Sequence, residues 1–113
     1  MKKVLALAGF AEIATGVALV VVPTLVGRLL LGEELAGAFI PVARVAGIAL
    51  VALGVACWPG TPLVGMLIYG AAVALYLAYL GCAGGASGIL LWPAVVLHVI
   101  LTALLTLAGQ RSP

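Results

Sequence analysis

The chain has 113 residues, of which 66% are hydrophobic and only 7% are charged, and its formal net charge is +2 at pH 7. Soluble domains average about a quarter charged residues, and a water-soluble fold of this composition would have too little polar surface to cover its core. The composition therefore predicts an integral membrane protein, and its few scattered cations exclude a nucleic-acid-binding face.

The first apolar stretch, residues 4–23, is long enough to cross a bilayer and carries an acid, Glu12, near its middle. A carboxylate at that depth costs at least about 2 kcal/mol, so Glu12 needs a partner, a proton or water. The start of the chain resembles a signal peptide, but the run is longer than a signal's apolar region and lacks a cleavage segment. We expect an uncleaved first span that Pro23 ends.

The next segment, residues 24–39, is the only predicted connection with charges of both signs. On a helix its apolar and charged side chains separate, with Leu25, Leu29 and Leu30 on one stripe and Arg28, Glu33 and Glu34 off it. This pattern predicts a short helix lying along the membrane interface, with an ordinary loop as the alternative.

Three further apolar segments are long enough to span a bilayer, at residues 40–58, 62–81 and 89–108. Pro41 suits a first helical turn, and residues 58–62 have the composition of a tight turn. Residues 81–88 are rich in glycine but are not followed by the residues of a phosphate-binding loop, so they predict a turn. Ser87 is the expected cap of the last span, with Pro93 in or near its first turn. The expected fold is all-α, a single domain over residues 1–113 with four transmembrane helices and a short interfacial helix after the first.

Positive residues usually flank the cytoplasmic side of a membrane protein. In a four-span chain Lys2, Lys3 and Arg111 lie on one side, and Arg28 and Arg44 lie on or near the other. Both termini are therefore expected in the cytoplasm, with the protein in the inner (plasma) membrane. The bias is a single charge, so insertion in both orientations stays open.

Small residues recur along the spans. Three short strings repeat at an offset of 38 positions, with Ala8-Gly9, 16–18 and 25–27 matching Ala46-Gly47, 54–56 and 63–65. Such matches arise easily in a chain this rich in alanine, valine, leucine and glycine. Small residues four apart, as at Ala43 and Gly47, predict close helix packing, either within the bundle or in a homo-oligomer.

Polar side chains inside the spans are the candidate ligand-binding residues, namely Glu12, Arg44, Tyr69, Tyr76 and His98. Glu12 and His98 both lie near the predicted midplane, and we expect them to interact directly or through one water. Arg44 has two interpretations, since it could reach the headgroups and the acids of the connection or turn inward toward Glu12 and Tyr76. Threonines in the spans are expected to bond their own helix backbone.

No catalytic motif is present, and no catalytic residue is predicted. One histidine and one glutamate without a third ligand make a poor metal site, so no metal is expected. Cys57 and Cys82 are predicted to be small packing residues at opposite membrane surfaces.

Two parts of the first half carry a family resemblance. The run Pro23-Thr24-Leu25-Val26-Gly27-Arg28-Leu29-Leu30-Leu31-Gly32 is followed by Ala43-Arg44-Val45-Ala46-Gly47-Ile48-Ala49-Leu50-Val51-Ala52-Leu53-Gly54. Together they resemble small bacterial four-helix membrane proteins of the DoxX-like kind. The resemblance implies a bundle without established catalysis, in some cases an accessory subunit of a quinone-linked redox complex. A glutamate in the first of four spans also resembles the small multidrug resistance exporters, but Arg44, the charged connection and the lack of an intramembrane tryptophan in the third span depart from them.

The leading hypothesis is a membrane protein that binds a small hydrophobic or amphiphilic ligand, a quinone or a lipid, or that serves a larger membrane complex as an accessory subunit. The alternative is a proton-coupled exporter of small lipophilic cations that uses Glu12 for both proton and substrate. Arg44 discriminates between them, because a permanent cation favours a quinone oxygen or a phosphate and repels a cationic substrate.

Overall fold

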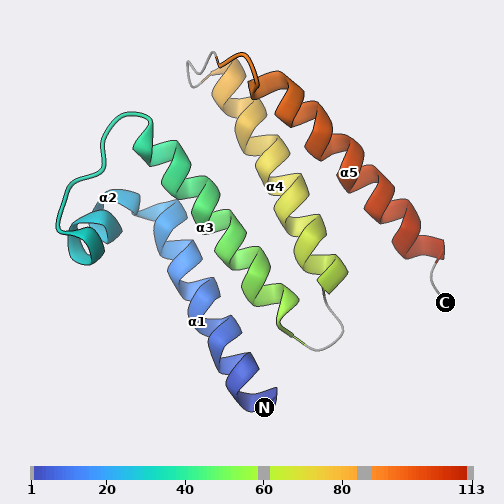
Figure 1. Cartoon of the computed structure of the whole chain (residues 1–113), viewed down its shortest axis with the longest axis horizontal. Helices are drawn as coiled ribbons and strands as arrows, with labels where there is room; N and C mark the ends of the chain where they lie inside the picture. The colour runs from blue at the N-terminus through green and yellow to red at the C-terminus, as the bar shows by residue number, and fades with distance from the viewer. Residues whose placement is uncertain (1, 59–61, 84–87, 112–113) are drawn as a thin grey trace. The chain divides into compact units, whose positions relative to one another are not determined.

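The computed structural model describes residues 2–58, 62–83 and 88–111, and most of these residues are helical, with no β-strand among them (Figure 1). Four helices are long and apolar enough to cross a membrane. The elements follow in the order α1 (Lys2–Val21), α2 (Pro23–Val26), the π-helix η1 (Gly27–Leu31), α3 (Phe39–Ala56), α4 (Pro62–Cys82) and α5 (Leu91–Arg111). The predicted all-α fold is confirmed, including the short helix between the first and second spans.

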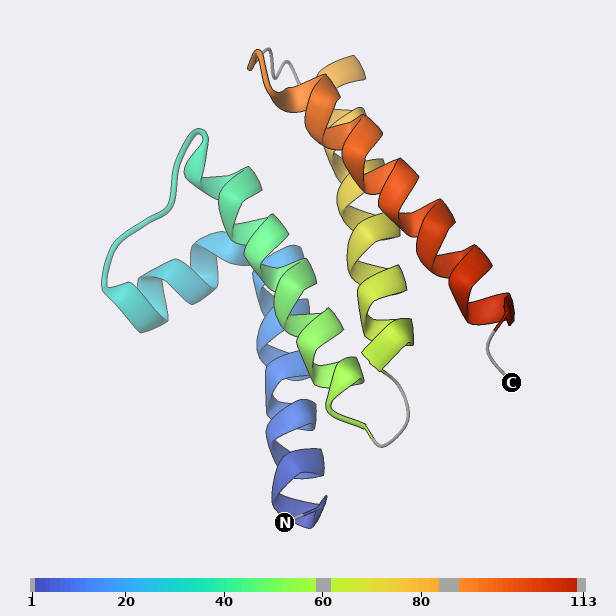
Figure 2. The ribbon, with the colours of Figure 1, turned by 45° about the vertical axis from the view of Figure 1, so that its right-hand side comes forward.

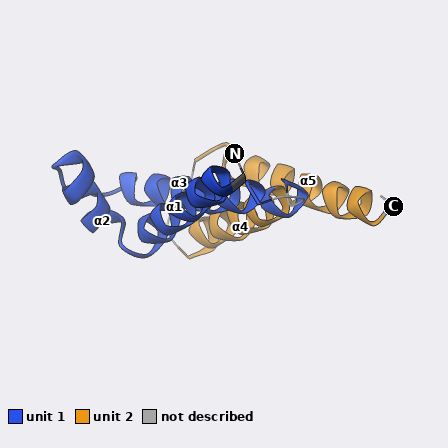
Figure 3. Cartoon of the chain, turned by 90° about the horizontal axis from the view of Figure 1, so that it is seen from below, with its two compact units in different colours: residues 1–65 blue, residues 66–113 orange. Residues whose placement is uncertain are grey.

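The chain divides into two compact units, residues 1–65 and residues 66–113, which are described separately (Figure 3). The first unit contains α1, α2, η1, α3 and the first turn of α4. The second contains the rest of α4 and α5. The single four-helix domain stays a prediction.

Prolines mark four of the helix starts, including that of α4, whose first residue is Pro62. Proline lacks the N–H group that an α-helix needs beyond its first turn, so it is tolerated only at a start or a break. Pro23 is the first residue of α2, while Pro41 and Pro93 are the third residues of α3 and α5. The predicted cap Ser87 lies outside the described residues.

Helices α1 and α3 run antiparallel, side by side (Figures 1 and 2). Their backbones approach most closely at two pairs of glycines. A β-carbon on Gly16 would lie 2.5 Å from the carbonyl oxygen of Gly47, and one on Gly47 would lie 2.6 Å from the oxygen of Gly16. The same reciprocal contact links Gly9 and Gly54, where a β-carbon on Gly9 would lie 2.9 Å from the oxygen of Gly54. Only glycine allows two backbones to approach this closely.

These four glycines belong to the 38-residue repeat. Gly9 and Gly16 of α1 correspond to Gly47 and Gly54 of α3, and the antiparallel arrangement pairs each with the non-equivalent copy. The repeat, which composition alone made unremarkable, therefore marks the contact line between α1 and α3. We call this line, defined by the pairs Gly9–Gly54 and Gly16–Gly47, the glycine seam.

Burial in this protein falls on small residues. The only buried hydrophobic side chains among the described residues belong to Ala52, Val73, Ala74 and Val95, whereas Leu29, Ile89 and many other large apolar side chains are exposed. In water such exposure would drive aggregation, but in a bilayer lipid tails cover it. The pattern fits four helices in contact with lipid.

The segment after α1 turns away from that helix (Figure 2). η1 continues from α2 as one wide turn, a geometry that is rare and often occurs at functional sites. Gly32 ends it with a φ of 76°, in the left-handed region that favours glycine.

Candidate functional site

The five predicted site residues divide between the two units. Glu12 and Arg44 lie in the first unit, on α1 and α3, while Tyr69, Tyr76 and His98 lie in the second, on α4 and α5. The expected pairing of Glu12 with His98 involves both units and stays a prediction.

Arg44 binds the end of α1. Its Nε donates a hydrogen bond of 3.1 Å to the carbonyl oxygen of Val20, one residue before α1 ends. Carbonyls in the last turn of a helix lack a helical donor, and the carbonyl of Val20 accepts no backbone bond across the break between α1 and α2 in the described residues. The cation also lies at the negative end of the helix dipole, where it is stabilising. This role differs from both sequence-based interpretations of Arg44.

Glu12 makes no hydrogen bond or ion pair within the described parts of the chain, and its side chain is half-buried. Glu12 precedes Gly16 by four residues, and Arg44 precedes Gly47 by three. Because α1 and α3 are antiparallel, these steps lead in opposite directions, so Glu12 and Arg44 are separated along the helix axes by about 10 Å. Among the described residues of the first unit, Glu12 is therefore an acid without a partner.

Tyr69 and His98 come together in the second unit. Their ring centroids lie 5.9 Å apart with an interplanar angle of 61°, an edge-to-face arrangement that aromatic rings prefer. Both side chains are half-buried. The ring contact joins α4 to α5 in the middle of two spans.

One imidazole nitrogen of His98 makes a hydrogen bond within α5, and the other has no hydrogen-bond partner among the described residues. Nδ1 lies 2.7 Å from the carbonyl oxygen of Ala94, one turn earlier on α5. A carbonyl only accepts hydrogen bonds, so Nδ1 carries the hydrogen and Nε2 of a neutral ring is left as an acceptor. Neither Nε2 nor the hydroxyl of Tyr69 has a hydrogen-bond partner among the residues that the structure describes.

The threonines bond their own helices, as predicted. Thr102 donates to the carbonyl of His98 at 2.7 Å, Thr106 donates to that of Thr102 at 2.8 Å, and Thr15 donates to that of Ala11 at 2.9 Å. Of these, Thr102 also packs against α4, because its hydroxyl occupies the space that a β-carbon on Gly70 would need.

Tyr76 does not join Tyr69 and His98 through any bond or ring contact found within the described residues. Instead it stacks on Tyr79 of the same helix, with ring centroids 6.4 Å apart and an interplanar angle of 21°. The structure thus brings two of the five predicted site residues together, and Tyr79 is a neighbour that the sequence reasoning did not single out.

A second feature missed from the sequence is an apolar pocket in the first unit, formed where α2 and η1 pass over the start of α3. Gly27 and Gly32, which give η1 its close packing and its sharp end, were the available sequence signal. Along the described chain, no three histidine, cysteine, aspartate or glutamate side chains gather into a metal site.

No family model, curated protein sequence or solved structure matches this chain.

Proposed function

We propose that this membrane protein binds an amphiphilic ligand with a hydrogen-bonding oxygen, a quinone, at Tyr69 and His98. The observation that carries the proposal is the edge-to-face contact of these two rings, whose hydroxyl and Nε2 have no partner within the described chain. Polar groups inside a span are costly in hydrocarbon, and they usually mark a ligand or a proton path.

The hydroxyl of Tyr69 and Nε2 of His98 offer a ligand one hydrogen-bond donor and one hydrogen-bond acceptor. The hydroxyl of Tyr69 donates a hydrogen bond, which a quinone carbonyl accepts. Nε2 of neutral His98 accepts one, which the hydroxyl of a reduced quinol donates. The pair therefore offers a partner to either form of the ligand, and the surrounding apolar helices suit its ring and tail.

This ligand agrees with the DoxX-like resemblance of the first half of the chain. We accordingly propose membership of that family, with a role as an accessory subunit of a quinone-linked membrane complex. A homo-oligomer is the other assembly that fits the small residues on the spans.

The test is quinone binding by the purified protein in mild detergent. A Tyr69→Phe variant removes one hydroxyl, and loss of one hydrogen bond of about 1.5 kcal/mol weakens binding about tenfold. His98→Leu should weaken it at least as much. Tyr79→Phe is the matched control, because it removes the same group from an exposed tyrosine on the same helix.

Binding is measured by extracting the bound quinone and by titration of a quinone analogue. Equal affinity of the wild type and of all three variants would refute the proposed site. Loss of binding in Tyr79→Phe alone would move the site along α4.

The second candidate function is export of lipophilic cations coupled to protons. It is favoured by one observation, a half-buried acid in the first span without a partner among the described residues. The experiment is uptake of a fluorescent lipophilic cation by proteoliposomes under a proton gradient. Transport by the wild type that Glu12→Gln abolishes would favour the exporter, while the absence of transport would exclude it.

A further inference from the structure

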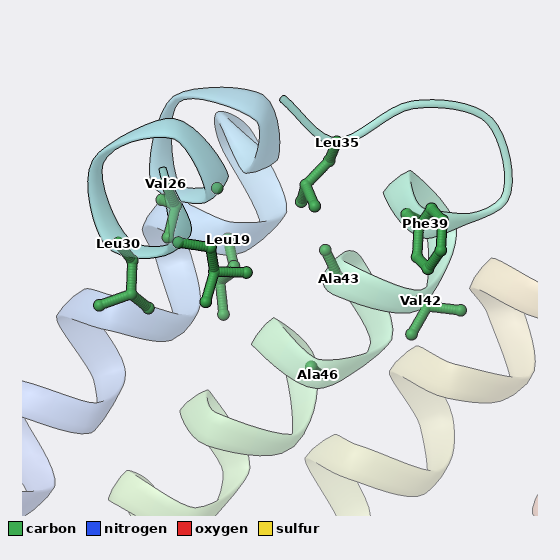
Figure 4. A pocket seen from close by; sticks show the side chains of 10 residues that line it. Leu19, Val26, Leu30, Leu35, Phe39, Val42, Ala43 and Ala46 are labelled. Atoms are coloured by element: carbon green, nitrogen blue, oxygen red, sulfur yellow. The ribbon is translucent and has the colours of Figure 1, made fainter. Parts of the chain in front are cut away.

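The pocket in the first unit is a feature that the quinone proposal does not use. It has a volume of about 190 Å³, and all ten residues that line it are apolar or glycine (Figure 4). Val26 and Leu30 form one side, Leu35 lies above, and Phe39 and Ala43 form the side contributed by α3.

The wide turn η1 and two glycines create this pocket. A β-carbon on Gly27 would lie 2.6 Å from the side chain of Leu35, so glycine at this position lets Leu35 pack directly over η1. Gly32 supplies the reversal with its positive φ. A π-turn and a left-handed glycine within six residues shape a hollow that a regular helix would have closed.

The size and lining of the pocket indicate which kind of molecule it can hold. Ligand sites for whole small molecules usually measure about 300–1,000 Å³ and include a few polar groups. This pocket is smaller and has no polar lining, so it fits a length of hydrocarbon chain. Phe39 and Leu30 are themselves largely exposed, which gives a chain from the surrounding bilayer a direct path into the pocket.

Two charged residues are next in sequence to residues that line the pocket, and they bear on the lipid headgroup. Arg28 and Glu34 form an ion pair of 3.1 Å, with 61% and 69% of their side chains exposed. Arg28 is next in sequence to Gly27, and Glu34 is next to Leu35, so each charge adjoins a lining residue. The guanidinium keeps further N–H donors for a phosphate, and the carboxylate keeps acceptors for an ammonium group.

We infer that the pocket holds part of one acyl chain of a zwitterionic phospholipid, with the lipid phosphate at Arg28 and its primary amine at Glu34. A lipid with phosphate and amine matches the two exposed charges. An anionic lipid without an amine leaves Glu34 facing a like charge. This lipid site is independent of the quinone site at Tyr69 and His98.

The experiment is native mass spectrometry of the protein released from vesicles that contain equal amounts of phosphatidylethanolamine and phosphatidylglycerol. The wild type should retain the ethanolamine lipid in preference. Ala46→Phe fills the pocket from α3 and should lower retention of this lipid roughly tenfold. Ala14→Phe is its control, since it makes the same change at an exposed alanine of α1 outside the lining.

The headgroup contacts are tested by Arg28→Gln, which lies outside the four spans and leaves their packing unchanged. It should lower retention roughly tenfold, the effect of losing a charge-assisted hydrogen bond. Lys3→Gln removes an exposed cation elsewhere in the first unit and should have no effect.

Three outcomes would overturn the proposal: no retained lipid on the wild type, preferential retention of phosphatidylglycerol, or equal retention by Ala46→Phe and Ala14→Phe. A bound quinone lost in Ala46→Phe but kept in Tyr69→Phe would make the pocket a site for a quinone tail and would also overturn it. Failure of quinone binding alone leaves the lipid site standing.

Discussion

Replacing Gly47 by alanine should weaken the packing of α1 on α3. The new β-carbon would lie 2.6 Å from the carbonyl oxygen of Gly16, whereas ordinary contact begins at 3.4 Å. The oxygen belongs to the backbone of α1, so it cannot rotate away as the end of a side chain could. The two helices must therefore separate by about 0.8 Å, the difference between these two distances.

A separation of this size has a predictable cost. A gap of about 0.5–1 Å removes about a quarter to a half of the dispersion attraction of each atom pair across it. Overpacking of this kind typically costs about 1–3 kcal/mol, while alanine gains about 0.5–1 kcal/mol over glycine within a helix. In the middle of both ranges the overpacking cost exceeds the gain, so we expect a net loss of about 1 kcal/mol in the free energy of unfolding.

The assay is unfolding by a denaturing detergent, followed by circular dichroism of the protein in mixed micelles. Gly88→Ala is the control, because nothing lies within 4 Å of the position its β-carbon would take. Gly16→Ala should resemble Gly47→Ala, and the double variant should lose less than the two single losses combined, since the first change already separates the helices. A Gly47→Ala variant at least as stable as the wild type would refute the inference that the glycine seam stabilises the packing of α1 on α3.

Three further predictions concern other parts of the chain. Arg44→Leu leaves the carbonyl of Val20 without its donor, so the free energy of unfolding in the same assay should fall by about 1–2 kcal/mol, and an unchanged value would argue against the cap. Spin labels placed singly along residues 24–34 should show lipid accessibility with a helical period, whereas uniform exposure to water would mean that the segment lies off the membrane. Mild oxidation of the free thiols Cys57 and Cys82 should give no bond within one chain, because the four-span topology separates them by more than about 20 Å, and such a crosslink on a non-reducing gel would contradict that topology.

The elements of this fold could be predicted because each depends on neighbouring residues alone. Apolar length specifies a span, and proline specifies a start or a break, so the four long helices and the short helix at Pro23 follow directly from the sequence. The ion pair between Arg28 and Glu34 shows where this reasoning ends. Both lie in the connection that the charges singled out, but the sharp reversal at Gly32 decides that these two meet.

The candidate site could be predicted only in part, because it depends on contacts between helices. The sequence shows that Tyr69 and His98 are polar residues within spans, but their ring contact depends on how α4 lies against α5. The sequence marks Arg44 as a rare cation within a span, yet its partner is a backbone carbonyl of another helix, which carries no sequence signature. In the same way, the 38-residue repeat gained its meaning only when the structure paired its glycines.

The two contact points of the glycine seam also determine where the chain tolerates a change in length. One residue inserted between Gly9 and Gly16 would turn the second glycine about 100° around α1 and carry it out of reach of α3. An insertion between Gly47 and Gly54 would do the same from the other side, so neither interval tolerates gain or loss of a residue. The loop between η1 and α3, in contrast, bears no contact of the seam, so a change in its length would leave the packing of α1 on α3 unchanged. Its contacts at Glu34 and Leu35 belong to η1 and the pocket, so any variation in length should fall after Leu35, while the seven-residue intervals of both helices stay constant.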